Sequence, residues 1–269
     1  MDLADLDLRG RRMAGCDLTR AALSNTRFDG ADLSGAVLSK ARGHKPSFAG
    51  ARLRCAQLED AFLWEPDFQG ADLTGARLRD LKSPKGNFRS ARLVGASAVS
   101  AVLARAILDD VEAAGTDLSG ADLVRTSAKR ARLGGARLDA VIAEQACFEA
   151  ADLAAARAED AWFVGTSFEG ADLGGALLDE ANLGGVNLRC ATLEGASLVH
   201  ANLEGARLEQ ARARGARFTR ANLRRVDAVA ANLLDCDFDE ANLTDADLRR
   251  AELSPNQRSR AILTRARLG

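Results

Sequence analysis

The sequence predicts an all-β solenoid, because a five-residue pattern runs through its 269 residues without an insertion or a deletion. Counted in fives from Met1, Leu or Phe stands at the third place of 43 of 54 blocks, and Ala at the first place of 36. In repeat architectures each repeat contacts only its neighbours, so no second core is implied. We therefore expect one elongated repeat domain over residues 1–254.

Each block has the pattern of a short strand followed by a turn. A period of five matches neither the helical period of about 3.6 nor the strand period of about 2. Within a block, places one and three are apolar, and places two, four and five are polar. Two inward side chains around one outward side chain indicate a strand-like segment, so the chain bends at every block and winds around a narrow interior.

The phenylalanines predict how many blocks make one coil. Four of them are twenty residues apart, and two further pairs repeat that spacing: Phe28, Phe48, Phe68 and Phe88, then Phe148 with Phe168, and Phe218 with Phe238. Twenty residues correspond to four blocks, so we expect a four-sided coil. Gly43 and Ser83 occupy places that Leu takes elsewhere, and we expect bulged or looped corners there.

The last residues depart from the pattern. Ser254, Pro255 and Gln257 form a capping-box sequence with proline at the first helical position. This predicts a helix from about 255 to 267 in place of the apparent repeat AILTR. Its apolar stripe would contain Ala261, Ile262 and Leu263.

Blocks such as ADLSG, ADLTG, ANLGG and ANLEG resemble the pentapeptide-repeat proteins, including the Qnr-like members that interact with topoisomerases. The resemblance implies a right-handed quadrilateral β-helix of four pentapeptides per coil. It also implies that residues 255–269 form a helical cap and dimerisation segment, so that a homodimer forms through Ala261, Ile262 and Leu263. The projecting loops of the topoisomerase-interacting members have no counterpart in this sequence.

Composition argues against several classes of function. The net charge of −1 gives no general attraction to nucleic acid or to an anionic membrane. The five cysteines have no metal-ligand spacing, and free thiols fit a reducing cytoplasm. Because MDLADLDLRG lacks a basic segment followed by an apolar one and no apolar run is long enough to span a bilayer, we expect neither a signal segment nor a membrane span. His44 and His200 are too far apart to form a catalytic pair, so we expect no enzyme, no cofactor and no metal.

An acidic ladder is the first candidate site. Residues 141–205 carry a net charge of −9, and five acids stack at equivalent places of adjacent coils: Asp139, Glu159, Asp160, Asp179 and Glu180. Like charges at strand spacing are mildly destabilising. Either the ladder faces a basic partner surface, or it is a solvated face whose repulsion is screened by salt.

Outward apolar side chains are the second candidate site. They are expected on one side of the rod: Phe62, Trp64, Ile142, Trp162 and Val164. Aromatic side chains on a polar surface indicate a partner contact, although isolated surface hydrophobics are also normal.

The resemblance favours a non-enzymatic, DNA-mimicking rod. Such a rod binds DNA gyrase or topoisomerase IV and protects it from inhibitors, without binding nucleic acid itself. The alternative is a scaffold or regulatory protein that binds another protein through the aromatic side and has no topoisomerase role.

Overall fold

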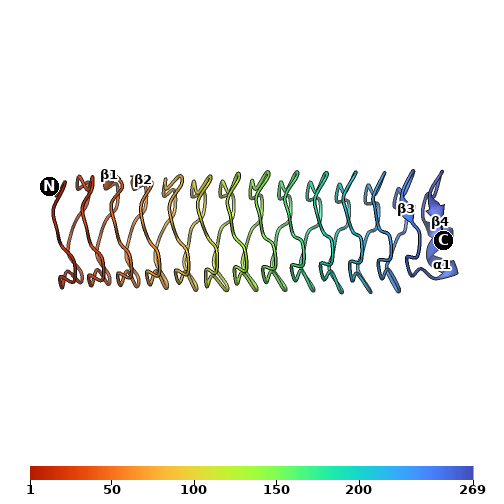
Figure 1. The fold of residues 1–269 in the computed structure, drawn as a ribbon, viewed down its shortest axis with the longest axis horizontal. Helices are drawn as coiled ribbons and strands as arrows, with labels where there is room; N and C mark the ends of the chain where they lie inside the picture. The colour runs from red at the N-terminus through yellow and green to blue at the C-terminus, as the bar shows by residue number, and fades with distance from the viewer. Residues whose placement is uncertain (269) are drawn as a thin grey trace. The chain divides into compact units, whose positions relative to one another are not determined.

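The computed structural model describes residues 1–268, which form two compact units, Met1–Arg137 and a second that begins at Leu138. In each unit the chain winds into a stack of similar coils (Figure 1). Second-place residues pair in parallel with residues twenty positions on, as Asp2 does with Ala22 and Ile142 with Trp162. One coil is therefore twenty residues long, which is the spacing of the phenylalanines.

Regular strands are short because a turn interrupts the chain in every block. In the first unit β1 (Arg42–His44) pairs in parallel with β2 (Phe62–Trp64). In the second unit β3 (Asp247–Leu248) pairs in parallel with β4 (Arg267–Leu268). Most of the remaining coil-to-coil pairing consists of single-residue bridges.

The turns explain the Asp or Asn at the second place of the repeat. Its side-chain oxygen accepts the backbone N–H two residues on, as between Asp72 and Thr74 at 3.1 Å and between Asn182 and Gly184 at 3.2 Å. This is an Asx-type turn, which holds the corner locally. The fifth residue has a positive φ even where it is not glycine, for example 53° at Ala140.

The interior consists of stacked Leu and Phe side chains, with Ala where the backbones come close. In the first unit the ring centroids of Phe48 lie 5.1 Å from Phe28 and 4.8 Å from Phe68. In the second unit Phe148 and Phe168 stack at 5.2 Å. Such stacking adds to the area that each ring buries.

Hydroxyl groups at the first place are buried but satisfied. The Thr116 Oγ1 donates to the Leu93 carbonyl at 2.6 Å in the first unit. In the second unit Thr166 donates to the Ala143 carbonyl at 2.5 Å. Each bond links adjacent coils, so threonine replaces the usual alanine without leaving a buried group unpaired.

The expected bulges at Gly43 and Ser83 are wrong. Gly43 pairs with Leu63 in register, and the Ser83 N–H donates to the Val102 carbonyl at 2.8 Å. A Cβ atom at Gly43 would lie 2.8 Å from the backbone carbon of Leu23. A missing side chain thus lets the coil pass close to its neighbour, and no looped corner is needed.

We expect Ser83→Ala to raise the free energy of unfolding by about 1 kcal/mol, because a buried hydroxyl without a partner costs about that much. Within residues 1–268, the Ser83 Oγ is buried and makes no hydrogen bond. Urea unfolding measures the change. Thr116→Ala is the control, because it removes the hydrogen bond from the Thr116 hydroxyl to the Leu93 carbonyl and should lower the free energy of unfolding. A lower free energy of unfolding in Ser83→Ala would contradict the prediction.

The helix predicted for residues 255–267 is shorter than expected. Helix α1 covers Pro255–Arg260, and the repeat then resumes. The Ile262 N–H donates to Ala241 at 2.9 Å, and the Ile262 carbonyl accepts from Leu243 at 2.8 Å. Ala261, Ile262 and Leu263 are therefore not a helical stripe. The helix ends at Arg260 because a longer helix would lose this backbone pairing with the previous coil.

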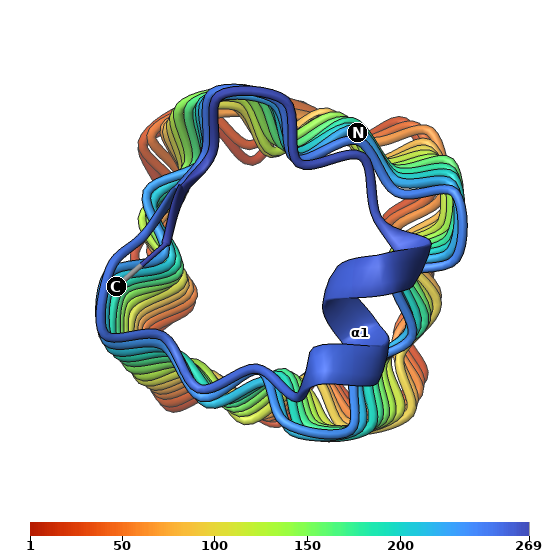
Figure 2. The same cartoon turned by 90° about the vertical axis from the view of Figure 1, so that its right-hand side faces the viewer.

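Gln257 explains how one helical turn fits into a coil. Its side-chain oxygen accepts the Ser254 N–H at 2.7 Å, as the capping-box sequence predicts. Its amide donates to the carbonyls of Leu233 at 2.7 Å and Cys236 at 3.0 Å. The helix lies at one side of the final coil (Figure 2), fastened to the coil before it by this buried side chain.

Candidate partner-binding surfaces

The acidic ladder of the second unit divides into engaged and free carboxylates. Arg157 lies 3.7 Å from an Asp139 oxygen and 3.4 Å from a Glu159 oxygen. The Asp179 carboxylate accepts the Ser197 hydroxyl and, at 2.8 Å, the Val199 N–H. All three fourth-place acids are half-buried. The Asp139 and Asp179 carboxylates accept backbone N–H groups of the next coil, and Glu159 is paired with Arg157, so these acids are engaged within the unit.

The fifth-place acids of the ladder face solvent. Asp160 and Glu180 are exposed at equivalent corners of adjacent coils, joined by the Asp160 N–H and the Asp179 carbonyl at 3.1 Å. Neither side chain makes an ion pair or hydrogen bond within the described residues. These two carboxylates are the part of the predicted ladder that a partner could reach.

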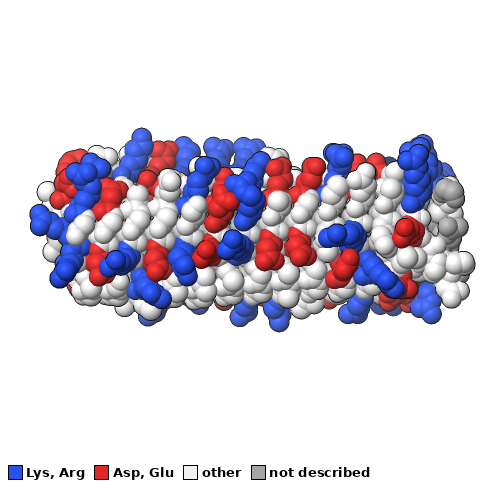
Figure 3. Space-filling model, turned by 60° about the horizontal axis from the view of Figure 1, so that its bottom comes forward, with Lys and Arg blue, Asp and Glu red and all other residues white. Residues whose placement is uncertain are grey.

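Elsewhere the surface charges interleave, as on the face in Figure 3. Many are paired between coils, for example Asp110 with Arg130 at 2.7 Å and Asp245 with Arg265 at 2.6 Å. The guanidinium of Arg130 holds the pKa of Asp110 below its usual value, and that of Arg265 does the same for Asp245. Opposite charges thus stack where like charges would repel.

The first unit exposes an aromatic pair on β2. Phe62 is 42% exposed and Trp64 37%, with ring centroids 6.5 Å apart. The Lys85 ammonium lies 5.4 Å from the centroid of the Trp64 ring, a cation–π contact. The sequence placed both side chains outward correctly.

The second unit exposes another apolar pair. Ile142 is 46% exposed and Trp162 45%, and the two residues pair on adjacent coils. Val164 is half-buried, so it contributes less surface than expected.

An asparagine ladder continues the Trp162 column and was missed in the sequence. Trp162 pairs with Asn182, and the Asn202 amide donates to the Asn182 oxygen at 3.1 Å. The Asn222 amide donates in turn to the Asn202 oxygen at 2.9 Å. Comparing every twentieth residue would have found it. These hydrogen bonds hold the asparagine side chains that continue the column of Trp162.

The residues proposed for dimerisation lie on the resumed coil. Ile262 is 49% exposed, and Ala261 and Leu263 are half-buried. The Leu268 side chain on β4 is also exposed, at 42%. This leaves apolar surface near the end of the second unit.

The cysteines differ in burial, which predicts that they differ in reactivity. Burial raises the pKa of Cys236 to about 12, whereas Cys55 and Cys190 are exposed. Because the thiolate is the reactive form, we expect the two exposed cysteines to react with Ellman's reagent at pH 8 and Cys236 to react only after unfolding. Peptide mapping identifies the labelled residues, and native labelling of Cys236 would contradict the expected packing.

Neither a metal-binding group nor a membrane-spanning helix occurs within residues 1–268. No three His, Cys, Asp or Glu side chains among residues 1–268 are grouped so as to hold a metal ion. In the same part of the chain, none of the helical structure has the length and hydropathy needed to cross a bilayer.

The twenty-residue coils and exposed side chains define a β-solenoid of five-residue repeats with surfaces open to a partner. Pentapeptide-repeat models match residues 2–41, 47–80, 87–125 and, in overlapping copies, 166–269. The chain belongs to the pentapeptide-repeat family, whose fold is a right-handed β-helix. The last match includes the residues after α1, in agreement with the resumed repeat.

Solved structures of this family are similar to the chain. HetL from the cyanobacterium Nostoc sp., a protein involved in heterocyst differentiation regulation, is 28% identical, covers 88% of this chain and 89% of its own, and has a TM-score of 0.38. A trypsin-treated variant of QnrB1, a plasmid-mediated fluoroquinolone resistance protein, is 21% identical over 92% and 91%, with a TM-score of 0.37. A protein of the Arabidopsis thaliana thylakoid lumen is 28% identical over 54% and 70%, with a TM-score of 0.23. No curated protein matches the chain.

Proposed function

We propose that the chain is a non-enzymatic binding protein that docks a partner protein on its exposed apolar pairs. The observation that carries this proposal is the exposure of Phe62 with Trp64 and of Ile142 with Trp162, two pairs of large apolar side chains on the surfaces of their units. Large aromatic side chains are enriched among the residues that dominate binding energy. The family to which the chain belongs is generally structural or binding rather than catalytic.

We expect Trp64→Ala and Trp162→Ala each to weaken partner binding by about 2 kcal/mol, roughly thirtyfold. Both side chains are about half exposed, so their removal should change the free energy of unfolding by less than about 1 kcal/mol. The partner, isolated from the source cells on the immobilised protein, is titrated against each variant. Arg217→Ala is the control, since Arg217 takes a second place, as Trp162 does, and is exposed. Unchanged affinity in both tryptophan variants would reject the aromatic contact.

A type II topoisomerase, DNA gyrase or topoisomerase IV, is the second candidate partner. The free carboxylates of Asp160 and Glu180 favour it, together with the net charge of −9 over residues 141–205. Such a surface would imitate DNA phosphates and shield the enzyme from inhibitors. Supercoiling by gyrase and drug-induced DNA cleavage are measured with the purified protein. Asp160→Lys with Glu180→Lys should abolish any effect, and no effect of the wild type at micromolar excess excludes this role.

The proposal also includes the finer architecture. A four-sided cross-section follows from four pentapeptides in each twenty-residue coil. Helix α1 would cap the second unit, and a homodimer would form through Ala261, Ile262 and Leu263. Analytical ultracentrifugation tests the dimer, which Ile262→Asp should convert to a monomer. A wild-type protein that stays monomeric at all concentrations would reject the proposed homodimer.

A further inference from the structure

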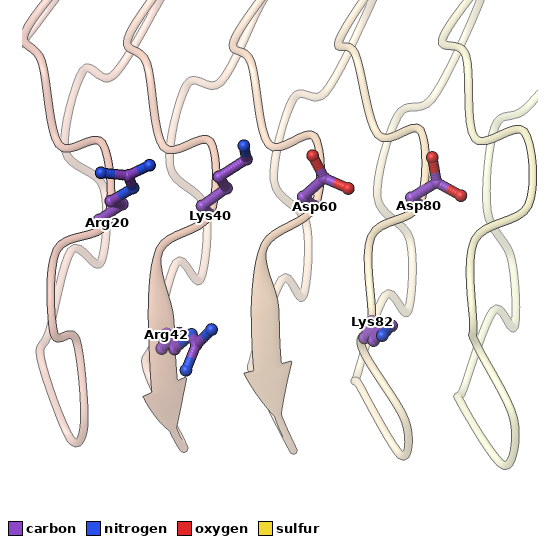
Figure 4. A pocket seen from close by; sticks show the side chains of 6 residues that line it. All are labelled: Arg20, Lys40, Arg42, Asp60, Asp80 and Lys82. Atoms are coloured by element: carbon purple, nitrogen blue, oxygen red, sulfur yellow. The ribbon is translucent and has the colours of Figure 1, made fainter.

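A charged groove lies on the first unit, lined by residues other than those of the acidic ladder. Its volume is about 820 Å³, within the range of ligand sites in proteins. Six charged side chains line it: Arg20, Lys40, Arg42, Asp60, Asp80 and Lys82. Four of them stand at the same corner of successive coils, with Arg42 and Lys82 on the next side (Figure 4).

None of these six side chains forms an ion pair with any residue that the structure describes. At several other corners, residues of opposite charge at fifth places of adjacent coils pair closely, as Glu65 does with Lys85 at 3.0 Å and Arg220 with Glu240 at 2.8 Å. Lys40 and Asp60 are also fifth-place residues on adjacent coils, yet they stay apart. Their charges remain open to the groove.

The order of charges along the groove has two poles. Arg20 and Lys40 are neighbours on adjacent coils, and Arg42 adds a third cation beside them. Asp60 and Asp80 follow at the same corner of the next two coils, while Lys82 lies on the next side of the coil that carries Asp80. Like charges stacked at strand spacing repel, so both pairs weaken the free protein. A ligand with a negative and a positive group would relieve both repulsions together.

The apolar pair of the first unit adjoins this groove. Phe62 pairs with Arg42 on one side and with Lys82 on the other. A protein segment docked on Phe62 would therefore meet both cations directly. The separation of the poles, two coils, is about 10 Å, and an extended peptide covers that distance in about three residues.

We propose that the groove binds a segment of the partner protein that carries both charge signs, with acidic side chains against Arg20, Lys40 and Arg42 and basic side chains against Asp60 and Asp80. This inference rests on the proposed protein-binding function for the nature of its ligand. It adds the chemistry of the docking segment, which the exposed aromatic residues do not specify.

Binding of short labelled peptides to the full-length protein tests the groove. The probe is an end-capped peptide, Glu-Glu-Gly-Arg-Arg, followed by fluorescence anisotropy at low salt. A peptide of equal composition, Glu-Arg-Gly-Arg-Glu, is the control for charge order. We expect the first peptide to bind at least about fivefold more tightly, as a few exposed ion pairs allow. Equal binding of the two peptides would overturn the proposal.

Variants of the protein locate the binding. Asp60→Asn with Asp80→Asn keeps residue shape and suits the positive φ of 58° and 56° at these positions. This double variant should lose the preference for the block peptide. The matched control is Glu194→Gln with Asp239→Asn, which removes the same charge from exposed residues of the second unit and should retain it. Preference that survives in the Asp60 and Asp80 variant would overturn the proposal.

Two other outcomes distinguish this proposal from a simple anion site and from the proposed partner-binding function. If an all-acidic peptide, Glu-Glu-Gly-Glu-Glu, binds more tightly than the block peptide, the groove is an anion site and the proposal fails. If the block peptide does not bind although partner binding still depends on Trp64, the groove inference fails and the proposed function stands.

Discussion

Phe48→Ala is expected to lower the free energy of unfolding by about 3–5 kcal/mol, the usual cost of removing a buried phenylalanine ring. The Phe48 ring is fully buried and stacks on Phe28 and Phe68, at 5.1 and 4.8 Å. Neighbouring coils cannot close the void without shifting their backbone bridges. Urea unfolding of the purified protein gives the change.

The control for this prediction is another phenylalanine of the same unit. Phe62 lies on β2 and is 42% exposed, so Phe62→Ala should cost less than about 1 kcal/mol. Comparable losses in the two variants would mean that the phenylalanine column is not the main support of this interior.

Gly43→Ala is expected to destabilise the protein by about 1–3 kcal/mol, as overpacking of an interior typically does. The repeat pattern alone suggests the opposite, because leucine is the common residue at this place. In the structure, a Cβ atom at Gly43 would lie 2.8 Å from the backbone carbon and 2.9 Å from the oxygen of Leu23. Backbone atoms at that distance cannot rotate away.

Gly184→Ala provides the matched comparison in thermal unfolding. Its φ is not positive, and a Cβ there would meet its nearest atom, of Asn182, at 3.4 Å. Restricting the unfolded chain should then stabilise by up to about 1 kcal/mol. A gain in stability for Gly43→Ala would show that the coils near β1 separate easily, contrary to the packing described here.

The periodic part of the fold could be predicted because one local rule repeats. The spacing of Phe28, Phe48 and Phe68 predicted the twenty-residue coil, and the alternation within each block predicted which side chains are buried. The rule failed where one residue changes a contact between coils. Gly43 was expected to form a bulge, but its missing side chain allows a close approach instead.

The end of the repeat was harder to predict because two local signals compete. Ser254 and Gln257 start a helix, and Ile262 restores pairing with the previous coil. Backbone pairing with a coil twenty residues earlier cannot be judged from helix-capping sequence alone. The hydrogen bonds of Gln257 to the carbonyls of Leu233 and Cys236 could likewise not be predicted, because they join residues more than twenty positions apart.

The sequence predicted where the candidate site residues lie, but not which of the charged side chains are paired. Exposure of Trp64 and Trp162 follows from their places in the block, and the structure agrees. Their role in binding stays a prediction. The sequence could not show which acids of the ladder are hydrogen-bonded. In the structure, Asp179 accepts a backbone N–H of the next coil, whereas Asp160 is exposed and unpaired among the described residues. Such differences depend on the side chains of adjacent coils.

Site-specific photocrosslinking tests the central claim, that a protein docks on the exposed apolar pairs, most directly. Benzoylphenylalanine is placed at Trp64, at Trp162 and, as a control, at Arg217, and cells are irradiated before mass spectrometry. We expect the same protein adduct at both tryptophan positions and none at Arg217. No adduct at either tryptophan position, or equal adducts at all three, would contradict it.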